Sequence, residues 1–333
     1  MLILNASQVR QTLPMPAAVE AMKRAFLAIS AGHADMPLRS HLEVAGGKGT
    51  TLVMPAHVVT GEEDSLAVKI VSVIGNNPDR GLPRILATVL AIDSETGQPI
   101  AVIEGTTITA IRTAAASAAA TDVLARPDSK TLAVIGAGVQ AREHIAAIHC
   151  VRDIRQTFVA ARDRSQCERL IEDMAAADPA IGGITICASA DEAVARADIV
   201  CTVTTSSDPV FLPGAIRPGT HINAVGSYQP HTVEIPAETV KEALVFVDHR
   251  GSAMEEAGDL IQPLEAGLID EGHILGEVGE VLSGRVASRR SAADITLFKS
   301  VGCAAEDCLA ASEVLGRAKE MGIGAELALI CNR

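Results

Sequence analysis

A glycine-rich turn in the middle of the chain has the residue types and spacing that bind phosphate. It reads GAGVQA at residues 136–141, between an apolar strand and a helix, and fits the pattern G-x-G-x-x-A. In this pattern the first glycine permits a tight turn, the second lets a pyrophosphate approach the backbone, and the small last residue lets the helix pack on the strand. Free N–H groups and the positive helix end then face the phosphates. The sequence predicts a dinucleotide site rather than a tight turn without a ligand, with contacts from Gly136, Gly138, Val139 and Gln140.

The strand after this turn, QTFVAAR, bears on which dinucleotide is bound. An acidic residue at the end of such a strand accepts hydrogen bonds from the adenosine ribose and excludes a 2′-phosphate. Here Ala161 occupies the expected tip, and Arg162 and Arg164 follow it and could bind a phosphate. The sequence therefore favours NADP(H). NAD(H) stays possible, because Asp163 would face the ribose if the tip lay slightly further along the chain.

Regular alternation of strands and helices predicts the fold around the turn. Short apolar strands are expected at TLAVIGAG, QTFVAAR, GITICA, DIVCTVTTS, THINAVGS and ALVFVD, with helices between the earlier ones. Strands that are apolar throughout and joined by helices indicate a parallel sheet covered on both faces. The predicted fold class is α/β, with a Rossmann dinucleotide-binding domain in this part of the chain.

The first part of the chain has a different pattern. A helix is expected at residues 14–32, and strands at 50–56, 66–74, 84–93 and 99–105 indicate a mainly antiparallel sheet. An Ala-rich helix at 106–125 follows, and then a polar linker at 126–130 that marks a domain boundary. A long helix that begins near residue 304 could return to this first domain.

Charge and composition exclude several classes of function. The formal charge is −13 and no run of Lys and Arg offsets it, so we expect binding neither to nucleic acid nor to anionic lipid. No apolar segment reaches about 18 residues, and no basic stretch precedes an apolar one at the start, so we expect a soluble, cytoplasmic protein without a membrane segment. The seven cysteines form no C-x-x-C pair and the nine histidines no H-x-x-x-H pattern. We therefore expect no metal site, and we interpret the cysteines as small buried residues.

Six segments in register carry a resemblance to a known family. They are MPLRSH, LAVKIVSV, ITAIRTAAASAAA, VIGAGVQAREHI, INAVGSYQPHTVEIP and DITLFKSVG. In this order they resemble the ornithine cyclodeaminase/μ-crystallin family over nearly the whole chain. The resemblance implies a homodimer with a discontinuous α+β substrate and dimerisation domain, residues 1–125 with 305–333, around a Rossmann domain at 126–304. The family includes ornithine cyclodeaminases, alanine dehydrogenases and reductases of α-imino acids, so membership alone does not identify a substrate.

The resemblance also implies a site for the substrate carboxylate. The motif positions are Arg39, Lys69 and Arg112, which in this family surround that group. Three cations in mostly apolar stretches of an acidic protein need an anion or buried partners, because an unpaired buried charge is costly. A bidentate Arg contact would orient the neighbouring carbon for hydride transfer. The alternative is that each cation extends its charged end to the solvent or pairs with a surface acid.

One position departs from the family pattern. Cyclodeaminases carry an Asp two residues before the Pro of the GSYQP segment, and this chain has Tyr228, its only tyrosine, in that place. A phenol, with an ordinary pKa near 10, donates a proton or hydrogen bond more readily than it accepts one, so the change weakens deamination as the reaction. An aromatic wall of the substrate pocket is the alternative role for Tyr228.

Motif transfer suggests further contacts with the dinucleotide. The positions are Thr113, Thr204, Gly226, Ser300 and Val301. Asp294 and Lys299 lie in the last of these segments and could be either structural partners or part of the site.

Together these residues favour one reaction. It is the NAD(P)H-dependent reduction of an α-imino acid, a cyclic ketimine such as Δ1-pyrroline-2-carboxylate, which would give L-proline. Hydride would pass to the imine carbon, and Lys69, Tyr228 or an ordered water would supply or maintain the proton on nitrogen. The alternatives are reduction of an acyclic imino acid of the iminosuccinate or alanine type, ornithine cyclodeamination, and a non-enzymatic protein that binds a small ligand with NADPH.

Overall fold

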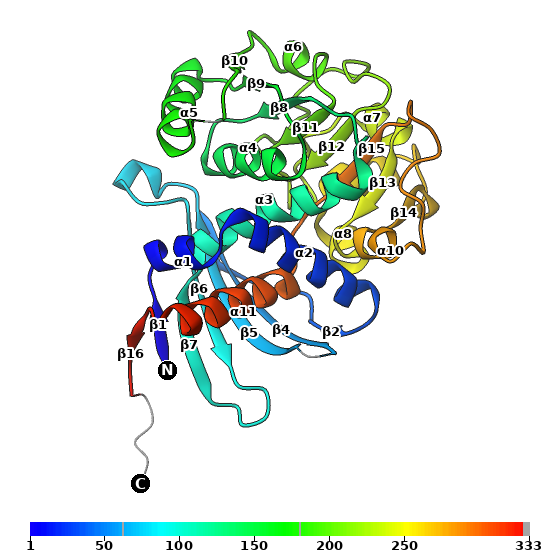
Figure 1. The fold of residues 1–333 in the computed structure, drawn as a ribbon. Helices are drawn as coiled ribbons and strands as arrows, with labels where there is room; N and C mark the ends of the chain where they lie inside the picture. Colours follow the sequence, from blue (N-terminus) through cyan, green and yellow to red (C-terminus); the bar gives the residue numbers. More distant parts are fainter. Residues whose placement is uncertain (62, 180, 329–333) are drawn as a thin grey trace. The chain divides into compact units, whose positions relative to one another are not determined.

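A computed structural model describes residues 1–61, 63–179 and 181–328, and the chain divides into two compact units (Figure 1). Unit 1 comprises Met1–Arg112 and Cys303–Arg333, and unit 2 comprises Thr113–Gly302. The chain passes from the first unit to the second within helix α3 (Gly105–Leu124). The boundary predicted after residue 125 falls at the end of the same helix and stays a prediction.

Unit 1 contains a mostly antiparallel sheet. Its strand order is β16-β1-β7-β6-β5-β4-β2, with β3 paired to β4, and only β1 and β7 run parallel. The strands are β1 (Leu2–Leu4), β2 (Ala34–Asp35), β3 (Ser40–Val44), β4 (Gly49–Thr60), β5 (Glu63–Ile74), β6 (Ile85–Ile92), β7 (Pro99–Glu104) and β16 (Ala325–Glu326). The four strands expected from the sequence are confirmed as β4 to β7, and so is their antiparallel pairing.

One face of this sheet is covered by helices. In β5, the side chains of Ala67, Lys69 and Val71 are buried and alternate with more exposed ones, as the two-residue period of a strand requires. The helices are α1 (Ala6–Thr12), α2 (Met15–Ser30) and α11 (Ala304–Met321), and α11 packs against α2, β4 and β5. The C-terminal helix thus returns to the N-terminal sheet, as the sequence suggested (Figure 1).

Unit 2 contains a parallel sheet in the doubly wound order. The order is β10-β9-β8-β11-β12-β15-β13-β14, and every pair is parallel. The strands are β8 (Thr131–Ile135), β9 (Gln156–Ala160), β10 (Ile184–Ile186), β11 (Ile199–Thr202), β12 (His221–Ala224), β13 (Leu244–Val247), β14 (Ile274–Glu277) and β15 (Thr296–Lys299). The strand order reverses between β8 and β11, which is where such sheets bind dinucleotides. The predicted α/β class and its Rossmann domain are confirmed.

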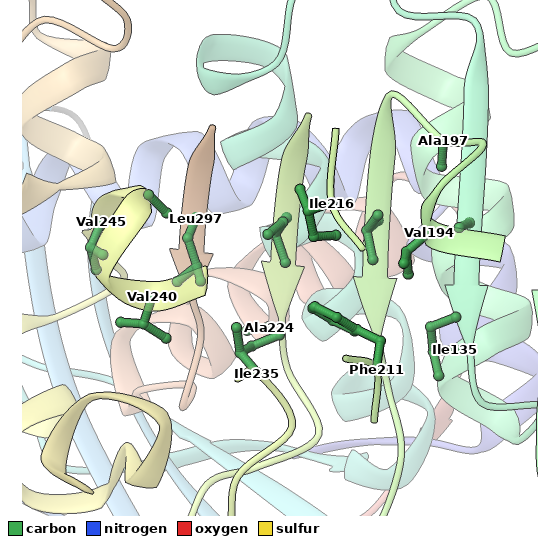
Figure 2. Close-up of a cluster of buried hydrophobic side chains, with 14 of the residues drawn as sticks. Ile135, Val194, Ala197, Phe211, Ile216, Ala224, Ile235, Val240, Val245 and Leu297 are labelled. Carbon is green, nitrogen blue, oxygen red and sulfur yellow. The ribbon is translucent and has the colours of Figure 1, made fainter. Parts of the chain in front are cut away.

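Helices and short turns connect these strands. They are α4 (Val139–Val151), α5 (Arg164–Ala177), α6 (Ala190–Val194), α7 (Ala237–Glu242), α8 (Arg250–Glu256), α9 (Gly258–Glu265) and α10 (Val278–Leu282). Short 3-10 turns lie at Pro78–Arg80 in unit 1 and Glu271–His273 in unit 2. Figure 2 shows the apolar cluster on one face of the parallel sheet, to which Ile135, Ala224 and Leu297 contribute from or beside the strands and Val240 from α7.

Three further expectations from the sequence concern membrane spans, metal sites and the cysteines. Within residues 1–61, 63–179 and 181–328, no helix is both long and apolar enough to cross a membrane, and no three His, Cys, Asp or Glu side chains are grouped to hold a metal ion. Six cysteines lie in this part of the chain, and none of them forms a disulfide. Five are buried as expected, but Cys150 is exposed, and Cys331 lies outside the described residues.

Candidate functional site

Lys69 is a buried cation on the inner face of the unit 1 sheet. It lies on β5, opposite Met54 of β4 and Val89 of β6, and its side chain is 2% exposed. Its ammonium group forms an ion pair with Asp307 of α11. Burial lowers the pKa of Lys69 to about 8; Asp307 opposes this shift, and the charges of Arg112 and Arg39 add to it. The ammonium group is therefore poised to lose or regain a proton near neutral pH.

Arg112 is held by two buried carboxylates. Its Nε donates to Asp307 Oδ1 and its Nη1 to Glu306 Oε2, both at 2.9 Å. Burial works against the charged form, but the two carboxylates outweigh it and raise the pKa of Arg112 above its usual range. Burial likewise opposes the charged form of Asp307, yet Arg112 and Lys69 lower the pKa of that carboxyl. The group is thus a set of mutually stabilised charges in the core of unit 1.

The first turn of α11 supplies both acids. Cys303 is the N-cap, and its backbone N–H donates to Glu306 Oε1 at 3.3 Å. Acidic side chains in a first turn interact favourably with the positive end of the helix. The sequence analysis did not select Glu306 or Asp307, although an adjacent acidic pair in the apolar run AAEDCLAA was a signal that could have done so.

Arg39 completes the set of predicted cations in unit 1. It lies in the segment before β3, is half-buried, and contributes to lowering the pKa of Lys69. The structure thus brings the three cations close enough for their charges to interact. Glu306 and Asp307 balance the charges of Lys69 and Arg112, and Arg39 is a further positive group in this part of unit 1.

The glycine turn of unit 2 has the geometry that the fingerprint requires. Gly136 has φ +118°, and a Cβ there would lie 2.8 Å from the carbonyl oxygen of Val203, so a side chain does not fit. At Gly138 a Cβ would meet nothing within 4 Å, which leaves room beside the backbone. Ala141 is fully buried at the start of α4, and Val139 is 56% exposed. These features suit a pyrophosphate against the N-terminus of α4.

The acidic residue that follows β9, Asp163, already accepts a hydrogen bond within the protein. Asp163 is the N-cap of α5 and accepts a hydrogen bond of 2.9 Å from the backbone N–H of Ser165. Arg162 is exposed. Arg164 Nε lies 3.2 Å from Glu168 Oε1, and the two residues form an exposed ion pair one helical turn apart. The strand itself ends at Ala160, so Ala161 is the first residue beyond it.

Buried acids hold the strand ends predicted to contact the cofactor. Thr204 and Gly226 both donate to the carboxylate of Glu234. The backbone N–H groups of Val301 and Gly302 donate to Asp248 at 2.8 and 2.7 Å, and the Ser300 hydroxyl donates to it at 3.3 Å. The structure brings each pair of predicted residues together through an acid that the sequence analysis did not select. Thr113 lies on α3, where unit 2 begins.

The roles of Lys299 and Asp294, left open by the sequence, differ in the structure. Lys299 is fully buried and pairs with Asp259 at 2.8 Å. Asp294 is half-buried and closes a surface turn by accepting from the backbone N–H groups of Arg290 and Ser291. Both therefore have structural partners within unit 2.

Tyr228 lies in the loop that follows β12. The loop is closed by a bond of 3.1 Å from the Thr232 N–H to the Gln229 carbonyl, and the Ser227 and Thr232 hydroxyl oxygens are 3.0 Å apart. Tyr228 is half-buried and belongs to unit 2, whereas the three cations belong to unit 1. Its catalytic role stays a prediction.

Comparison with known proteins places the chain in a family. Residues 1–322 match the model of the ornithine cyclodeaminase/mu-crystallin family. The chain belongs to this family. The resemblance stated from the six sequence segments is thereby confirmed.

Three relatives are informative. The chain is 36% identical over 327 residues to Delta(1)-pyrroline-2-carboxylate reductase of Bacillus cereus, covering 97% of this chain and 98% of the relative. The solved structure of Thermococcus litoralis Delta(1)-pyrroline-2-carboxylate reductase, in complex with NADH and L-proline, matches with TM-score 0.94 and 40% identity over 98% of this chain and 100% of that one. An archaeal alanine dehydrogenase dimer with bound NAD matches with TM-score 0.91 and 31% identity over 99% of both chains. All three names describe oxidoreductases that act on imino or amino acids.

Proposed function

We propose that this protein reduces an α-imino acid with NAD(P)H, and that the substrate is a cyclic ketimine such as Δ1-pyrroline-2-carboxylate, which gives L-proline. The observation that carries the proposal is the buried charged group of unit 1, in which Lys69 and Arg112 are held by Glu306 and Asp307. The same chain carries a glycine turn fit for a dinucleotide. Two pyrroline-2-carboxylate reductases at 36% and 40% identity over nearly the full length support the choice of substrate.

The buried charged group has donors that suit the carboxylate of an imino acid. Nε and Nη1 of Arg112 hold the two acids, and Nη2 is the remaining nitrogen of the guanidinium fork. Arg39 and Arg112 both disfavour the charged form of Lys69, and a substrate carboxylate would relieve that repulsion. Binding of the carboxylate would therefore fix the adjacent imine carbon in place and keep Lys69 protonated.

Lys69 is the group best suited to hold a proton at the imine nitrogen. A bound reduced nicotinamide supplies the hydride that forms the new C–H bond at the imine carbon. Lys69, with a pKa of about 8, can donate a proton to the nitrogen near neutral pH. Tyr228 is the second candidate, as a hydrogen-bond donor.

Specific observations bear on the alternative functions. Tyr228 in place of the cyclodeaminase Asp disfavours deamination of ornithine, because the phenol is a poor base near neutral pH. Reduction of an acyclic imino acid is the closest alternative, since the alanine dehydrogenase covers the chain to the same extent at lower identity.

Turnover of purified protein tests the proposal. With NADH or NADPH, we expect Δ1-pyrroline-2-carboxylate to be reduced with a larger kcat/KM than iminosuccinate or pyruvate with ammonia, and L-proline to accumulate. Release of ammonia from ornithine in the presence of NAD would contradict the interpretation of Tyr228. Tight binding of either dinucleotide without turnover of any imine would support the binding protein instead.

We further propose that NADP(H) is preferred, as the end of β9 suggests. Asp163 is engaged at the cap of α5, and Arg162 and Arg164 flank it. Arg162→Ala should raise the KM for NADPH about 30-fold, since a hydrogen bond to a charged group contributes about 1.5–3 kcal/mol, and should change the KM for NADH less than about 2-fold. The matched control is Arg155→Ala, an exposed arginine just before the opposite end of β9. Equal effects on the two dinucleotides would contradict the preference.

We also propose that the protein works as a homodimer in the cytoplasm. The outward face of the unit 1 sheet carries the exposed apolar side chains of Val53, Val59, Ile70 and Leu86. Such a face suits burial against a second copy of the chain. Sedimentation of the purified protein would give its mass in solution, and a monomer would contradict the proposal.

A further inference from the structure

The carboxylate of Glu234 is fully buried in unit 2 and accepts four hydrogen bonds. Oε1 accepts from the backbone N–H of Thr204 at 2.7 Å and from the hydroxyl of the same residue at 2.6 Å. Oε2 accepts from the hydroxyl of Thr202 at 2.9 Å and from the backbone N–H of Gly226 at 2.6 Å. Since a carboxylate offers about four acceptor positions, Glu234 is saturated by groups from just two strand ends.

Those two ends belong to neighbouring parallel strands. β11 ends at Thr202 and β12 at Ala224, so the N–H groups of Thr204 and Gly226 lie just beyond the two strands, where the last backbone bond between them runs from the Gly226 N–H to the Thr202 carbonyl at 3.2 Å. Glu234 accepts from both and thereby links one strand end to the other. The approach is close, because a Cβ on Gly226 would lie 2.3 Å from the Thr204 carbonyl oxygen and 2.5 Å from Glu234 Oε1.

A second buried layer holds Glu234 itself. The backbone N–H groups of Glu234 and Ile235 donate to Asp259 Oδ1 at 2.7 and 2.9 Å. Asp259 Oδ2 pairs with Lys299 at 2.8 Å, and Lys299 also donates to the Ser227 carbonyl, in the loop that carries Tyr228. The ends of β11, β12 and β15 are thus tied together by buried charges.

Burying the carboxylate of Glu234 costs free energy that apolar side chains in the same place would not. Burial raises the pKa of Glu234 and the charge of Asp259 adds to this shift, whereas the bonds from Thr204 and the nearby Lys299 oppose it. Apolar side chains of similar size are often equally or more stabilising than a buried ionic group. A requirement for fixed backbone positions at these strand ends explains the acid better than stability does.

The place of these ends in the sheet indicates what they serve. In a doubly wound sheet the dinucleotide lies across the carboxyl ends of the strands, where the order reverses. The reversal falls between β8, which leads into the glycine turn, and β11. The glycine turn therefore serves the pyrophosphate, and the ends of β11 and β12 lie on the other mononucleotide half of the sheet.

We infer that Glu234 is a positioning residue for the nicotinamide half of the dinucleotide, because its carboxylate fixes the Thr204 and Gly226 backbone at the carboxyl edge of β11 and β12. This inference rests on the proposed dinucleotide-dependent reduction. It assigns to Glu234 no contact with the substrate. Its action is through the two strand ends, and binding of the adenine half does not depend on it.

The variant Glu234→Gln tests this assignment. Whichever way the amide is turned, its NH2 group faces a backbone N–H, that of Thr204 or that of Gly226. The Thr204 N–H would lose its bond to the carboxylate, and the Gly226 N–H would be left with its longer bond of 3.2 Å to the Thr202 carbonyl. Because displacement of a reacting group by about 1 Å can cost about 100-fold in rate, we expect kcat for imine reduction to fall about 30-fold. Inhibition by ADP, which reports the adenine half, should stay within about 2-fold of the parent.

Two further variants make the result decisive. Glu280→Gln is the matched control, since Glu280 also accepts from a backbone N–H, that of Glu277 at 3.0 Å, in the capping box of α10; its kcat should match the parent. Thr202→Val removes one donor from Oε2 without adding another, and it should lower kcat about 3-fold, still without effect on ADP. It replaces Glu234→Gln if that variant does not fold.

The outcomes separate this inference from the proposed function. An unchanged kcat in Glu234→Gln, or equal losses in the affinities for NADH and ADP, would overturn the assignment. If the parent protein reduced no imine with either dinucleotide, the proposed function would fail. The assignment would then be judged by NADH fluorescence titration, in which Glu234→Gln should weaken NADH binding while ADP binding is kept.

Discussion

Replacement of Arg112 by lysine is expected to lower kcat/KM for the imine about 100-fold and to leave the Kd for the dinucleotide within about 2-fold. Arg112 engages Asp307 through Nε and Glu306 through Nη1, and a substrate carboxylate would use the remaining nitrogen of the fork. A lysine keeps the positive charge but has one nitrogen at the end of a flexible stem, so it cannot reproduce this planar set of contacts. Loss of a charge-assisted contact of about 3 kcal/mol corresponds to the expected decrease. Steady-state kinetics with the imine varied, and fluorescence titration of NADH, measure the two quantities.

Stability needs its own control in this experiment. Removing the cation altogether, as in Arg112→Met, would leave Glu306 and Asp307 buried beside one another and cost about 3–5 kcal/mol. Arg152→Lys is the matched control, because Arg152 is also mostly buried, pairs with Asp122 at 2.9 Å and lies in unit 2. It should lower the melting temperature with little effect on kcat/KM. Retention of kcat/KM within about 3-fold in Arg112→Lys would place the carboxylate site elsewhere.

Local patterns in the sequence predicted much of the fold. The glycine turn is specified by neighbouring residues, because the conformation of Gly136 and the room beside Gly138 follow from a strand that leads directly into a helix. The strands of both units have apolar patterns that propensity alone can identify. Helix α1 was missed, although Asn5 and Gln8 form a capping box whose spacing is visible in the sequence.

The buried charges were harder to predict because their partners are distant in the chain. Lys69 and Arg112 were identified by motif, but the acid that holds both of them, Asp307, is 195 residues from Arg112. Likewise, nothing in the local sequence of Glu234 indicates that it joins the ends of two strands. A single acid near a proline resembles any surface residue until the fold places it at the edge of the sheet. Long-range pairing of this kind depends on topology, which single-sequence patterns do not encode.

The second large effect is expected from Lys69→Met, which should lower kcat about 1000-fold, within the range for loss of a general acid. Methionine has a similar length and is apolar, so it fits the sheet face between Met54 and Val89 while removing the proton donor. Tyr228→Phe is the companion variant. A decrease of less than about 10-fold there would assign the proton to Lys69, and the reverse ranking would assign it to the phenol.

The pH dependence supplies an independent check on Lys69. Its protonated form is the donor, so kcat/KM, which reports the free enzyme, should fall as the pH rises through about 8. The descending limb of the kcat profile should lie at higher pH than that of kcat/KM, because a bound substrate carboxylate stabilises the ammonium ion of Lys69. Asp307 raises the pKa of Lys69, so Asp307→Asn should move the kcat/KM limb to lower pH. The substrate's own ionisation is the same for both proteins, and an unchanged limb would therefore show that it belongs to the substrate or to another group.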